Sequence, residues 1–301
     1  MIAGAWWRTL KPMEGPLPLN RISAPLRSSN AVLRARSRTH FVKNFAGPLS
    51  IKSVTEGTVA WKCAGRERPV DRDSFLVLNL DEPYSMEIDS RTAVSTLCVF
   101  FEDGFVESVY GSLVGHEMEG DCERLPFLGG LHSRDHRILP RMHAIAEAGA
   151  CDRLWLDEQF LLLARDLLWL NGEMRQRTAR MPADRPATRE ELFRRVRRGQ
   201  EYLHASTSLN PDLAEIARHA CLSPYHFHRA FTRAFGQTPH QYGNRLRLER
   251  ARRLLESEGL TVTEICGAVG FESAASFSAL FRRAFGVPPS AWRHAQISKI
   301  R

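Results

Sequence analysis

The sequence predicts an α+β protein with two domains, an N-terminal antiparallel β-barrel followed by helices and an all-helical C-terminal domain. Three observations predict this class: short β-rich segments lie between residues 40 and 101, a leucine-rich helical stretch follows them, and the C-terminal part contains an internal repeat. With 301 residues and 43% hydrophobic content, the chain is long enough to build two separate cores.

Prolines mark where the domains should begin and end. Residues 1–39 contain four prolines and close with most of the basic run RARSRTH, which predicts a loosely ordered arm. Residues 182–189 hold two more prolines among small and polar residues, which is typical of an interdomain linker. We therefore expect the two domains at residues 40–181 and 190–301.

The segment from residue 40 to residue 101 has the composition of several short strands. β-branched and aromatic side chains dominate five stretches, namely residues 49–54, 58–63, 74–80, 84–88 and 93–101. Turn signals, among them Glu56-Gly57 and Asp89-Ser90, separate these stretches. Many short strands at this spacing favour an antiparallel sandwich or barrel.

Residues 136–177 change to a helical period. Leucine and phenylalanine cover more than one face of the predicted helix, so we expect it to be buried on several sides. Such a helix can pack on the barrel and also against a second copy of itself. The candidate dimerisation residues are Leu156, Phe160, Leu163 and Leu167.

An internal repeat organises the C-terminal part. Residues 223–239 (SPYHFHRAFTRAFGQTP) and 273–289 (SAASFSALFRRAFGVPP) share eight identities in 17 positions at an offset of 50. In each copy a serine suited to cap a helix comes first, phenylalanines recur at every fourth position, and a glycine and a proline follow. Because a repeated sequence indicates a repeated structure, we expect two similar helices, each with an aromatic stripe.

A shorter helix should precede each of these two helices. Asn210-Pro211 begins the first, and Thr261 with Glu264 forms a capping box at the start of the second. Only a few residues separate each short helix from the next cap, which is the helix-turn-helix pattern. An amphipathic helix over residues 242–256 should join the two units, and another over residues 188–205 should precede them, which gives about seven helices in all.

The two parts of the chain differ in charge. Residues 1–181 contain 23 basic and 23 acidic residues, whereas residues 182–301 contain 19 basic and 11 acidic residues. A basic domain beside a neutral one indicates a polyanionic partner, although a merely soluble basic surface has the same composition.

The residues that define the two helix pairs, together with the helix between them, carry a family resemblance over about residues 190–294. They are Ile216-Ala217, Leu222-Ser223, Phe227, Phe231, Phe235-Gly236, Arg247-Leu248, Ala251, Leu254-Leu255, Ile265, Val269-Gly270-Phe271, Phe277, Phe281, Phe285-Gly286, Pro289 and Trp292-Arg293. This region resembles the DNA-binding domain of the AraC/XylS family. The N-terminal part resembles, more loosely, the family's regulatory domain, a cupin-like barrel with a dimerising helix. The resemblance implies a transcriptional regulator that binds double-stranded DNA, forms a homodimer and contacts RNA polymerase.

The second helix of a helix-turn-helix unit lies in the major groove of DNA. By the resemblance, Tyr225, His228 and Arg229 occupy base-reading positions of the first unit, and Thr232 lies on the same predicted face. An arginine there can pair bidentately with guanine, which contributes about 1–3 kcal/mol of discrimination. A solvated helix face is the ordinary alternative for such residues.

The second helix-turn-helix unit offers fewer polar side chains on the equivalent face. Three alanines there cannot hydrogen-bond a base, which leaves Ser276 and Ser278 as base-reading candidates. We therefore expect the first unit to read most of the sequence, while the second positions the protein on DNA or contacts RNA polymerase. The candidate contacts with the DNA backbone are Ser223, Arg233, Ser273, Arg282 and Arg283.

The N-terminal barrel is a candidate sensor, because a small barrel can hold one small-molecule effector. The candidate lining residues are Trp61, Tyr84, Met86 and Phe100, which could equally fill the barrel as ordinary core. His40 is the one histidine in residues 40–101, so the pattern predicts neither a metal site nor a cofactor.

The sequence offers no positive case for catalysis. No nucleophile motif, phosphate loop or paired-carboxylate pattern stands out, so we expect no enzymatic activity. No stretch is apolar over a membrane-spanning length and the six cysteines form no C-x-x-C pair, so we expect a cytoplasmic protein with reduced thiols and no membrane partner. Two alternatives stay open: a DNA-binding protein whose barrel only dimerises the chain, and a cupin-type enzyme with a DNA-binding tail.

Overall fold

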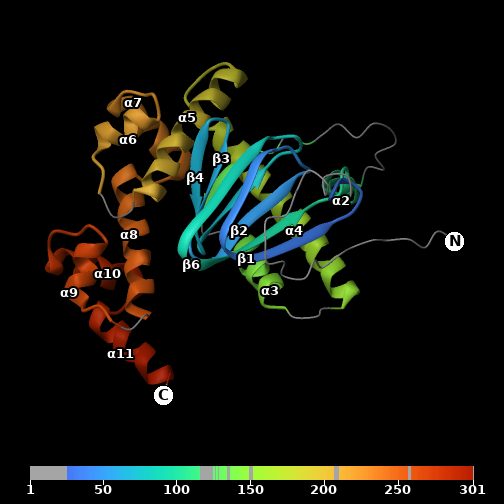
Figure 1. Cartoon of the computed structure of the whole chain (residues 1–301). Coiled ribbons are helices and arrows are strands. Elements are labelled where there is room, and N and C mark those ends of the chain that lie inside the picture. Colours follow the sequence, from blue (N-terminus) through green and yellow to red (C-terminus); the bar gives the residue numbers. More distant parts are fainter. Residues whose placement is uncertain are drawn as a thin grey trace. The chain divides into compact units, whose positions relative to one another are not determined.

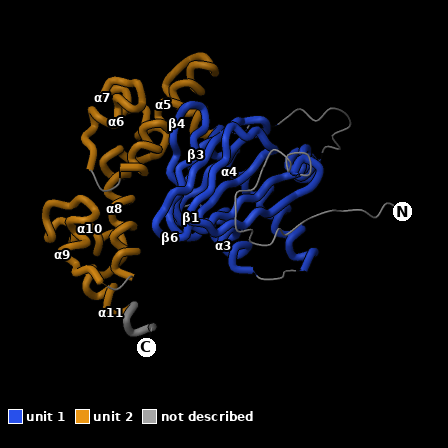
Figure 2. Tube along the Cα trace, in the orientation of Figure 1, with its two compact units in different colours: residues 1–175 blue, residues 176–301 orange. Residues whose placement is uncertain are grey.

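The structure, a computed structural model, describes residues 26–300 apart from 116–124, 126, 128, 134–135, 149–151, 207–209 and 257–258. The chain divides into two compact parts, the N-terminal domain (residues 1–175) and the C-terminal domain (residues 176–301), as Figures 1 and 2 show. The first contains a β-barrel with helices and the second is helical, which confirms the α+β class. Across the described ranges, no helix is long and apolar enough to cross a membrane.

In the described residues of the N-terminal domain, seven antiparallel strands form the barrel. They are β1 (Ala31–Phe45), β2 (Ser50–Glu56), β3 (Val59–Cys63), β4 (Arg66–Val70), β5 (Ser74–Leu78), β6 (Tyr84–Phe100) and β7 (Gly130–Ser133). The hydrogen-bonded order is β4-β3-β6-β2-β5-β7, and β1 also pairs with β6. The first part of β6 pairs with β3 and its later part pairs with β2, so the sheet curls around this long strand.

The strands differ from the sequence prediction at the point where a turn was expected. Asp89 and Ser90 lie inside β6, a single strand of 17 residues. β1 pairs with β6 on both sides of this point and shifts its register between Ser37 and Thr39. Because β1 continues the ladder past the polar residues, the chain stays extended where the local sequence favours a turn.

The barrel also begins earlier than predicted, because β1 starts at Ala31 and the arm expected through residue 39 is therefore wrong for residues 31–39. Arg34 gives the reason. Its guanidinium donates to the carbonyl oxygens of Ala148, at 2.7 Å, and Ile145, at the end of α3 (Ile138–Glu147). Arg34, which the sequence pattern placed in the arm, thus connects β1 to the end of α3. The rest of the predicted arm, residues 1–25, lies outside the described residues.

The long helix α4 (Arg153–Ala179) packs its apolar side within the N-terminal domain. The four predicted dimerisation residues, Leu156, Phe160, Leu163 and Leu167, are all buried there. The Phe160 ring meets the Phe101 ring edge-on, with 6.2 Å between centroids. The four side chains are therefore not exposed for contact with a second chain. The exposed leucines of α4 are Leu154 and Leu161, at 75% and 50% exposure.

Seven helices follow α4 in the described part of the C-terminal domain. They are α5 (Pro186–Ala205), α6 (Leu213–His219), α7 (Pro224–Phe235), α8 (Pro239–Glu256), α9 (Val262–Ala268), α10 (Ala274–Phe285) and α11 (Pro289–Ile300). The connection between α4 and α5 is residues 180–185, so the predicted linker at 182–189 extends into a helix. Pro186 begins α5 because a proline in the first helical turn needs no backbone donor.

Two small helical bundles form inside the C-terminal domain, one around α7 and one around α10. In the first, α5 and α7 approach closely at Gly199, where an added Cβ would lie 2.4 Å from the Phe227 ring. In the second, α10 packs on α8, α9 and α11 around Phe277 and Phe281, whose side chains are 0% exposed. Helix α8 contacts helices of both bundles and joins them (Figure 1).

Candidate nucleic-acid interface

Each helix-turn-helix unit is built from a short capped helix and a longer reading helix, α6 with α7 and α9 with α10. Asp212 caps α6, because its carboxylate accepts the backbone N–H of Glu215 at 2.7 Å. Thr261 and Glu264 form the predicted capping box at α9: the threonine hydroxyl accepts the Glu264 N–H at 3.2 Å, and the glutamate carboxylate accepts the Thr261 N–H at 2.6 Å. The Thr261 N–H and hydroxyl both donate to this carboxylate, which favours its charged form and lowers the pKa of the Glu264 carboxyl.

Both turns end the short helix in the same way. Cys221 in the first turn and Gly270 in the second have left-handed backbone, with φ of 54° and 78°. In the first turn the next N–H, that of Leu222, donates to the Ala217 carbonyl oxygen at 3.0 Å, and the second turn has the corresponding bond at 3.0 Å. This is the Schellman pattern of helix ends, which fixes the angle at which the reading helix leaves. Cys221 lies in the first turn with its side chain exposed.

The reading helix of the first unit presents its predicted face to solvent. Tyr225 is 69% exposed, and His228 and Arg229 are exposed beside it. On the opposite face Phe227 and Phe231 are completely buried. Thr232 is half-buried and its hydroxyl donates to the His228 carbonyl oxygen at 2.8 Å, so its hydrogen is already engaged within the helix.

The reading helix of the second unit is also exposed on its predicted face, but that face carries few groups that can form hydrogen bonds. Ala274, Ala275, Ser276 and Ala279 are exposed, whereas Ser278 is half-buried. Of the polar candidates on this helix, Ser276 is therefore the more accessible. The first reading helix, by contrast, exposes a phenol, imidazoles and a guanidinium.

The predicted backbone contacts lie at the two ends of the reading helices. Ser223 and Ser273 are the N-caps, and each hydroxyl accepts a backbone N–H of its own helix at 3.3 Å. Arg282 and Arg283 are exposed in the last turn of α10. Arg233 is exposed in α7, and its Nε donates to a carbonyl oxygen of the α4–α5 connection at 2.9 Å.

The repeat extends to the aromatic support behind each reading helix. Tyr242 packs edge-on against Phe231 with 5.4 Å between ring centroids. Fifty positions later, Trp292 packs edge-on against Phe281 with 6.2 Å between centroids. Each reading helix is thus held from behind by phenylalanines and by one further aromatic ring, which gives it a fixed position for contact with a rigid partner.

Arg247 in α8 contacts the turn of the second helix-turn-helix unit, a role that its sequence pattern did not indicate. The side chain is 5% exposed, and it donates to the Gly270 carbonyl oxygen at 3.0 Å and to the Asn244 side chain. Its guanidinium also lies 4.7 Å from the centroid of the Phe271 ring. Burial lowers the pKa of this guanidinium. One arginine of the joining helix therefore holds the turn of the second unit.

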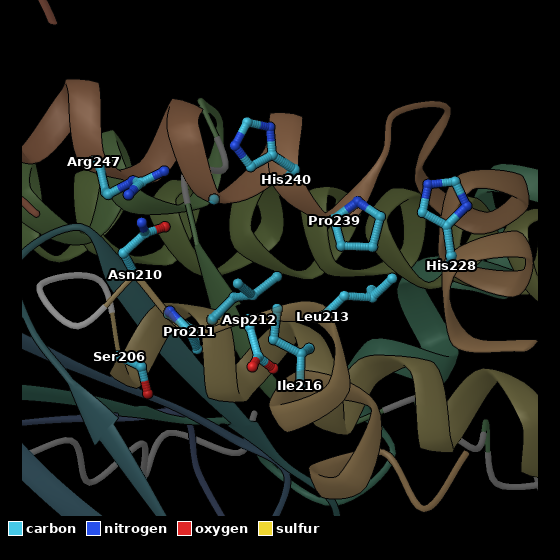
Figure 3. Close-up of a pocket in the computed structure, with 12 residues that line it drawn as sticks. Ser206, Asn210, Pro211, Asp212, Leu213, Ile216, His228, Pro239, His240 and Arg247 are labelled. Carbon is cyan, nitrogen blue, oxygen red and sulfur yellow. The ribbon is translucent and has the colours of Figure 1, made fainter. Parts of the chain in front are cut away.

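A pocket of about 310 Å³ opens in the C-terminal domain between α6, α7 and α8. Figure 3 shows Leu213 and Ile216 of α6 facing His240 and Arg247 of α8 across it. His228 of the reading helix also lines the pocket. A predicted base-reading side chain thus borders a pocket whose opposite wall carries the Arg247 guanidinium.

The structure brings the four predicted barrel-lining residues together. Trp61, Tyr84, Met86 and Phe100 belong to one buried cluster in the barrel, with exposures of 1%, 6%, 8% and 1%. The sequence missed their neighbour Lys52, which is completely buried. A lysine in a strand is ordinarily solvent-facing, so local pattern alone gave no signal for it.

Among the described residues, no group of three or more His, Cys, Asp or Glu side chains could hold a metal ion. His132 stacks on Phe75 with 5.3 Å between ring centroids. Burial lowers the pKa of His40, which lies in β1. The four described cysteines, Cys63, Cys98, Cys221 and Cys266, form no disulfide with one another.

Known proteins resemble the C-terminal part of the chain. A helix-turn-helix domain family matches residues 216–295. Over 83 residues the chain is 39% identical to the HTH-type transcriptional regulator Rv1931c of Mycobacterium tuberculosis, which covers 28% of this chain and 32% of that protein. Over 72 residues it is 42% identical to the HTH-type transcriptional activator RhaS of Pectobacterium carotovorum, covering 24% and 26%. The chain thus spans about a third or less of the length of these curated relatives.

A solved structure is similar to part of the chain. A transcriptional regulator from Chromobacterium violaceum with an AraC-type DNA-binding domain is 27% identical, with 34% of this chain and 91% of that chain covered and a TM-score of 0.33.

Two capped helix-turn-helix units on one joining helix define an AraC-type DNA-binding domain. In this region the chain is similar to helix-turn-helix transcriptional regulators, among them a solved regulator with an AraC-type DNA-binding domain.

Proposed function

We propose that this protein is a sequence-specific transcriptional regulator that inserts α7 and α10 into successive major-groove segments of one DNA duplex. The observation that carries the proposal is the pair of reading helices, each buried on its phenylalanine side and exposed on the other. Rigidly joined units meet grooves about one helical turn apart, roughly 34 Å. The protein would act on chromosomal DNA in the cytosol.

The first reading helix supplies most of the base recognition in this proposal. Tyr225, His228 and Arg229 offer donors and acceptors to base edges, and arginine suits guanine best. The exposed alanines of α10 can only meet thymine methyl groups, so Ser273, Arg282 and Arg283 there serve the phosphates. The surface of α10 that DNA leaves free is the candidate contact for RNA polymerase.

The N-terminal domain regulates DNA binding in this proposal by binding a small-molecule effector inside the barrel. The support is the cluster of Trp61, Tyr84, Met86 and Phe100, which combines aromatic walls with a flexible thioether. The competing reading is a barrel that only dimerises the chain. An effector that binds only the folded state raises thermal stability, so ligand screening by thermal shift separates the two readings.

Dimerisation through α4 is part of the proposal, with the outward leucines as its contact. Leu154 and Leu161 lie seven positions apart and are exposed, which is the spacing of a helix-to-helix seam. Sedimentation of the full chain should give a dimer, and a Leu161→Glu variant should give a monomer. A wild-type chain that sediments as a monomer at micromolar concentration would remove this part.

We also propose that the protein is not an enzyme. A cupin-type enzyme with a DNA-binding tail would need ligands for a catalytic metal in the barrel. The test is elemental analysis of the purified chain, and stoichiometric bound metal would revive the enzyme reading.

Selection of bound DNA from a random pool tests the proposed function most fully. We expect one well-defined site with strong base preferences over one half and weak preferences over the other. Affinity should fall steeply as salt rises, because phosphate contacts release counterions. A pool that shows no enrichment at low salt would refute the proposal.

A further inference from the structure

A lysine is completely buried inside the barrel of the N-terminal domain. Lys52 lies in β2 with an exposed fraction of 0%, and its Nζ has no hydrogen-bond partner among the residues that the structure describes. Its register partners are Leu76 on β5 and Cys98 on β6. Nζ lies over the rings of Tyr84 and Phe100, both members of the barrel core, so the side chain points into the barrel.

The ammonium has aromatic neighbours, and no carboxylate of the described residues pairs with it. Nζ is 3.6 Å from the centroid of the Phe100 ring and 4.8 Å from that of Tyr84. Aromatic faces attract a cation, yet they leave its three N–H donors without acceptors. In the described part of the chain, the ionisable group that acts on Lys52 is Cys98, and burial raises the pKa of that thiol and so favours its uncharged form. Burying an unpaired charge is unfavourable, so a folded protein ordinarily supplies a counter-charge.

We propose that Lys52 anchors the effector in the barrel and that the effector is a small monocarboxylate with an apolar body. This inference rests on the proposed function, which gives the barrel a small-molecule effector. One ammonium matches one negative charge, and a carboxylate accepts several hydrogen bonds at once. The Tyr84 hydroxyl is a further donor on a ring that already faces Lys52.

The walls of the site explain why the rest of the effector is apolar. Leu33 and Leu76 lie in the same cross-strand row as Lys52 and Cys98, because they are the register partners on β1 and β5. Both leucines belong to the barrel core or pack against it. Such walls offer no acceptor or donor to a polar body, so only the carboxylate of the effector would find polar partners.

The remaining exposure of the core indicates where the effector enters. Val42 and Met86, register partners on β1 and β6, are each 8% exposed, and Tyr84 is 6% exposed. Phe100, beside Lys52 on the other side, is only 1% exposed. Met86 has a flexible side chain that can change conformation at little cost. In this inference the effector therefore passes Met86 on its way from solvent to the ammonium.

Lysine-specific NMR on the full chain tests the proposal directly. The chain contains five lysines, so a sample labelled with 13C at lysine Cε gives few signals, and a Lys52→Arg variant assigns the one of interest. The probes are hexanoate and cyclohexanecarboxylate, with hexanamide and cyclohexanecarboxamide as neutral controls of the same shape. The free chain should titrate at Lys52 near its value of about 8, and a bound carboxylate should move that midpoint upward toward the ordinary 10.5.

A Lys52→Met variant provides the matched binding measurement. It removes the charge, keeps the length of the side chain and leaves the DNA-binding helices untouched. Thermal shift should show carboxylate binding weakened by roughly tenfold or more, as expected for loss of a charge-assisted hydrogen bond. Circular dichroism confirms that the variant is folded.

The outcomes separate this inference from the proposed function. A Lys52 titration that no carboxylate moves at millimolar concentration, equal effects of the acids and their amides, or undiminished carboxylate binding by Lys52→Met would each overturn the inference. DNA binding of the same samples, measured by fluorescence anisotropy, reports the proposed function independently. A chain that loses one property and keeps the other shows which of the two was wrong.

Discussion

Replacing Lys52 by methionine should stabilise the free barrel at neutral pH, and the gain should shrink in alkali. Burial lowers the pKa of the ammonium from 10.5 to about 8. At 1.36 kcal/mol for each pKa unit, the folded state disfavours the charged form by roughly 3 kcal/mol. The contacts with the Phe100 and Tyr84 rings offset part of this, by about 0.5–2 kcal/mol. The expected net gain at pH 7 is therefore roughly 1–3 kcal/mol.

The sign of the pH dependence follows from the two pKa values. Between about 8 and 10.5 the unfolded chain keeps the proton on Lys52 while the folded chain releases it. The unfolded state then binds more protons, so the stability of the native sequence rises with pH through this window. The contribution is complete above pH 10.5 and is lost as pH falls through about 8. The advantage of the methionine variant should therefore be large at pH 7 and small at pH 10.

Urea unfolding with pulse alkylation gives a local measurement of this difference. Cys63 and Cys98 lie in the barrel, Cys63 buried and Cys98 half-buried, and both become reactive when it opens. Mass spectrometry of their peptides gives the unfolding midpoint of the N-terminal domain in the full chain. Tyr84 and Cys98 also titrate, but both are present in the two chains and largely cancel in the difference. A methionine variant that is less stable at pH 7, or whose advantage does not change with pH, would show that the lysine already has a counter-charge in solution.

Three further predictions concern the C-terminal domain. Cys221→Gly should stabilise it by about 1 kcal/mol, because glycine adopts the left-handed backbone without strain and the exposed thiol loses no packing; thermal melting checks this, and a loss of stability would refute it. Arg247→Met should destabilise the C-terminal domain by roughly 1.5–3 kcal/mol, because the hydrogen bond to the Gly270 carbonyl is lost. Urea unfolding measures this change, and an unchanged midpoint would show that Arg247 does not hold the turn of the second unit. Arg229→Ala should relax specificity at one or two base pairs in selected DNA, at about 1–3 kcal/mol, whereas Ala279→Ser should change binding much less; equal damage from both would contradict the division of work between the two helices.

The repeat, with its helix caps and helix-ending glycines, made the C-terminal domain predictable from the sequence. Helix caps and helix ends depend on a few local residues, so Thr261 and Glu264 could be paired before any coordinates were known, and the structure confirms both bonds. Arg247 could not be placed in this way. Its burial depends on a turn 23 positions later, whose carbonyl oxygen and aromatic ring receive it.

The barrel was less predictable because strand pairing is decided by distant segments. β1 is rich in arginine and serine, yet it pairs with β6 over most of its length, and α3 accepts the hydrogen bonds of Arg34. β4 and β7 were not predicted at all, and they lie at the ends of the hydrogen-bonded order. Lys52 shows the same limit for the site: an alternating strand assigns a lysine to solvent, and only closure of the sheet turns that face inward.

The central claim is that two reading helices on one joining helix enter successive grooves on the same face of one duplex. Hydroxyl-radical footprinting of the full chain on its selected site tests this most directly. The account predicts two protected patches on one face of the DNA, separated by about 10–10.5 base pairs for each chain bound. A single patch that corresponds to one helix-turn-helix unit, or two patches on opposite faces, would contradict it.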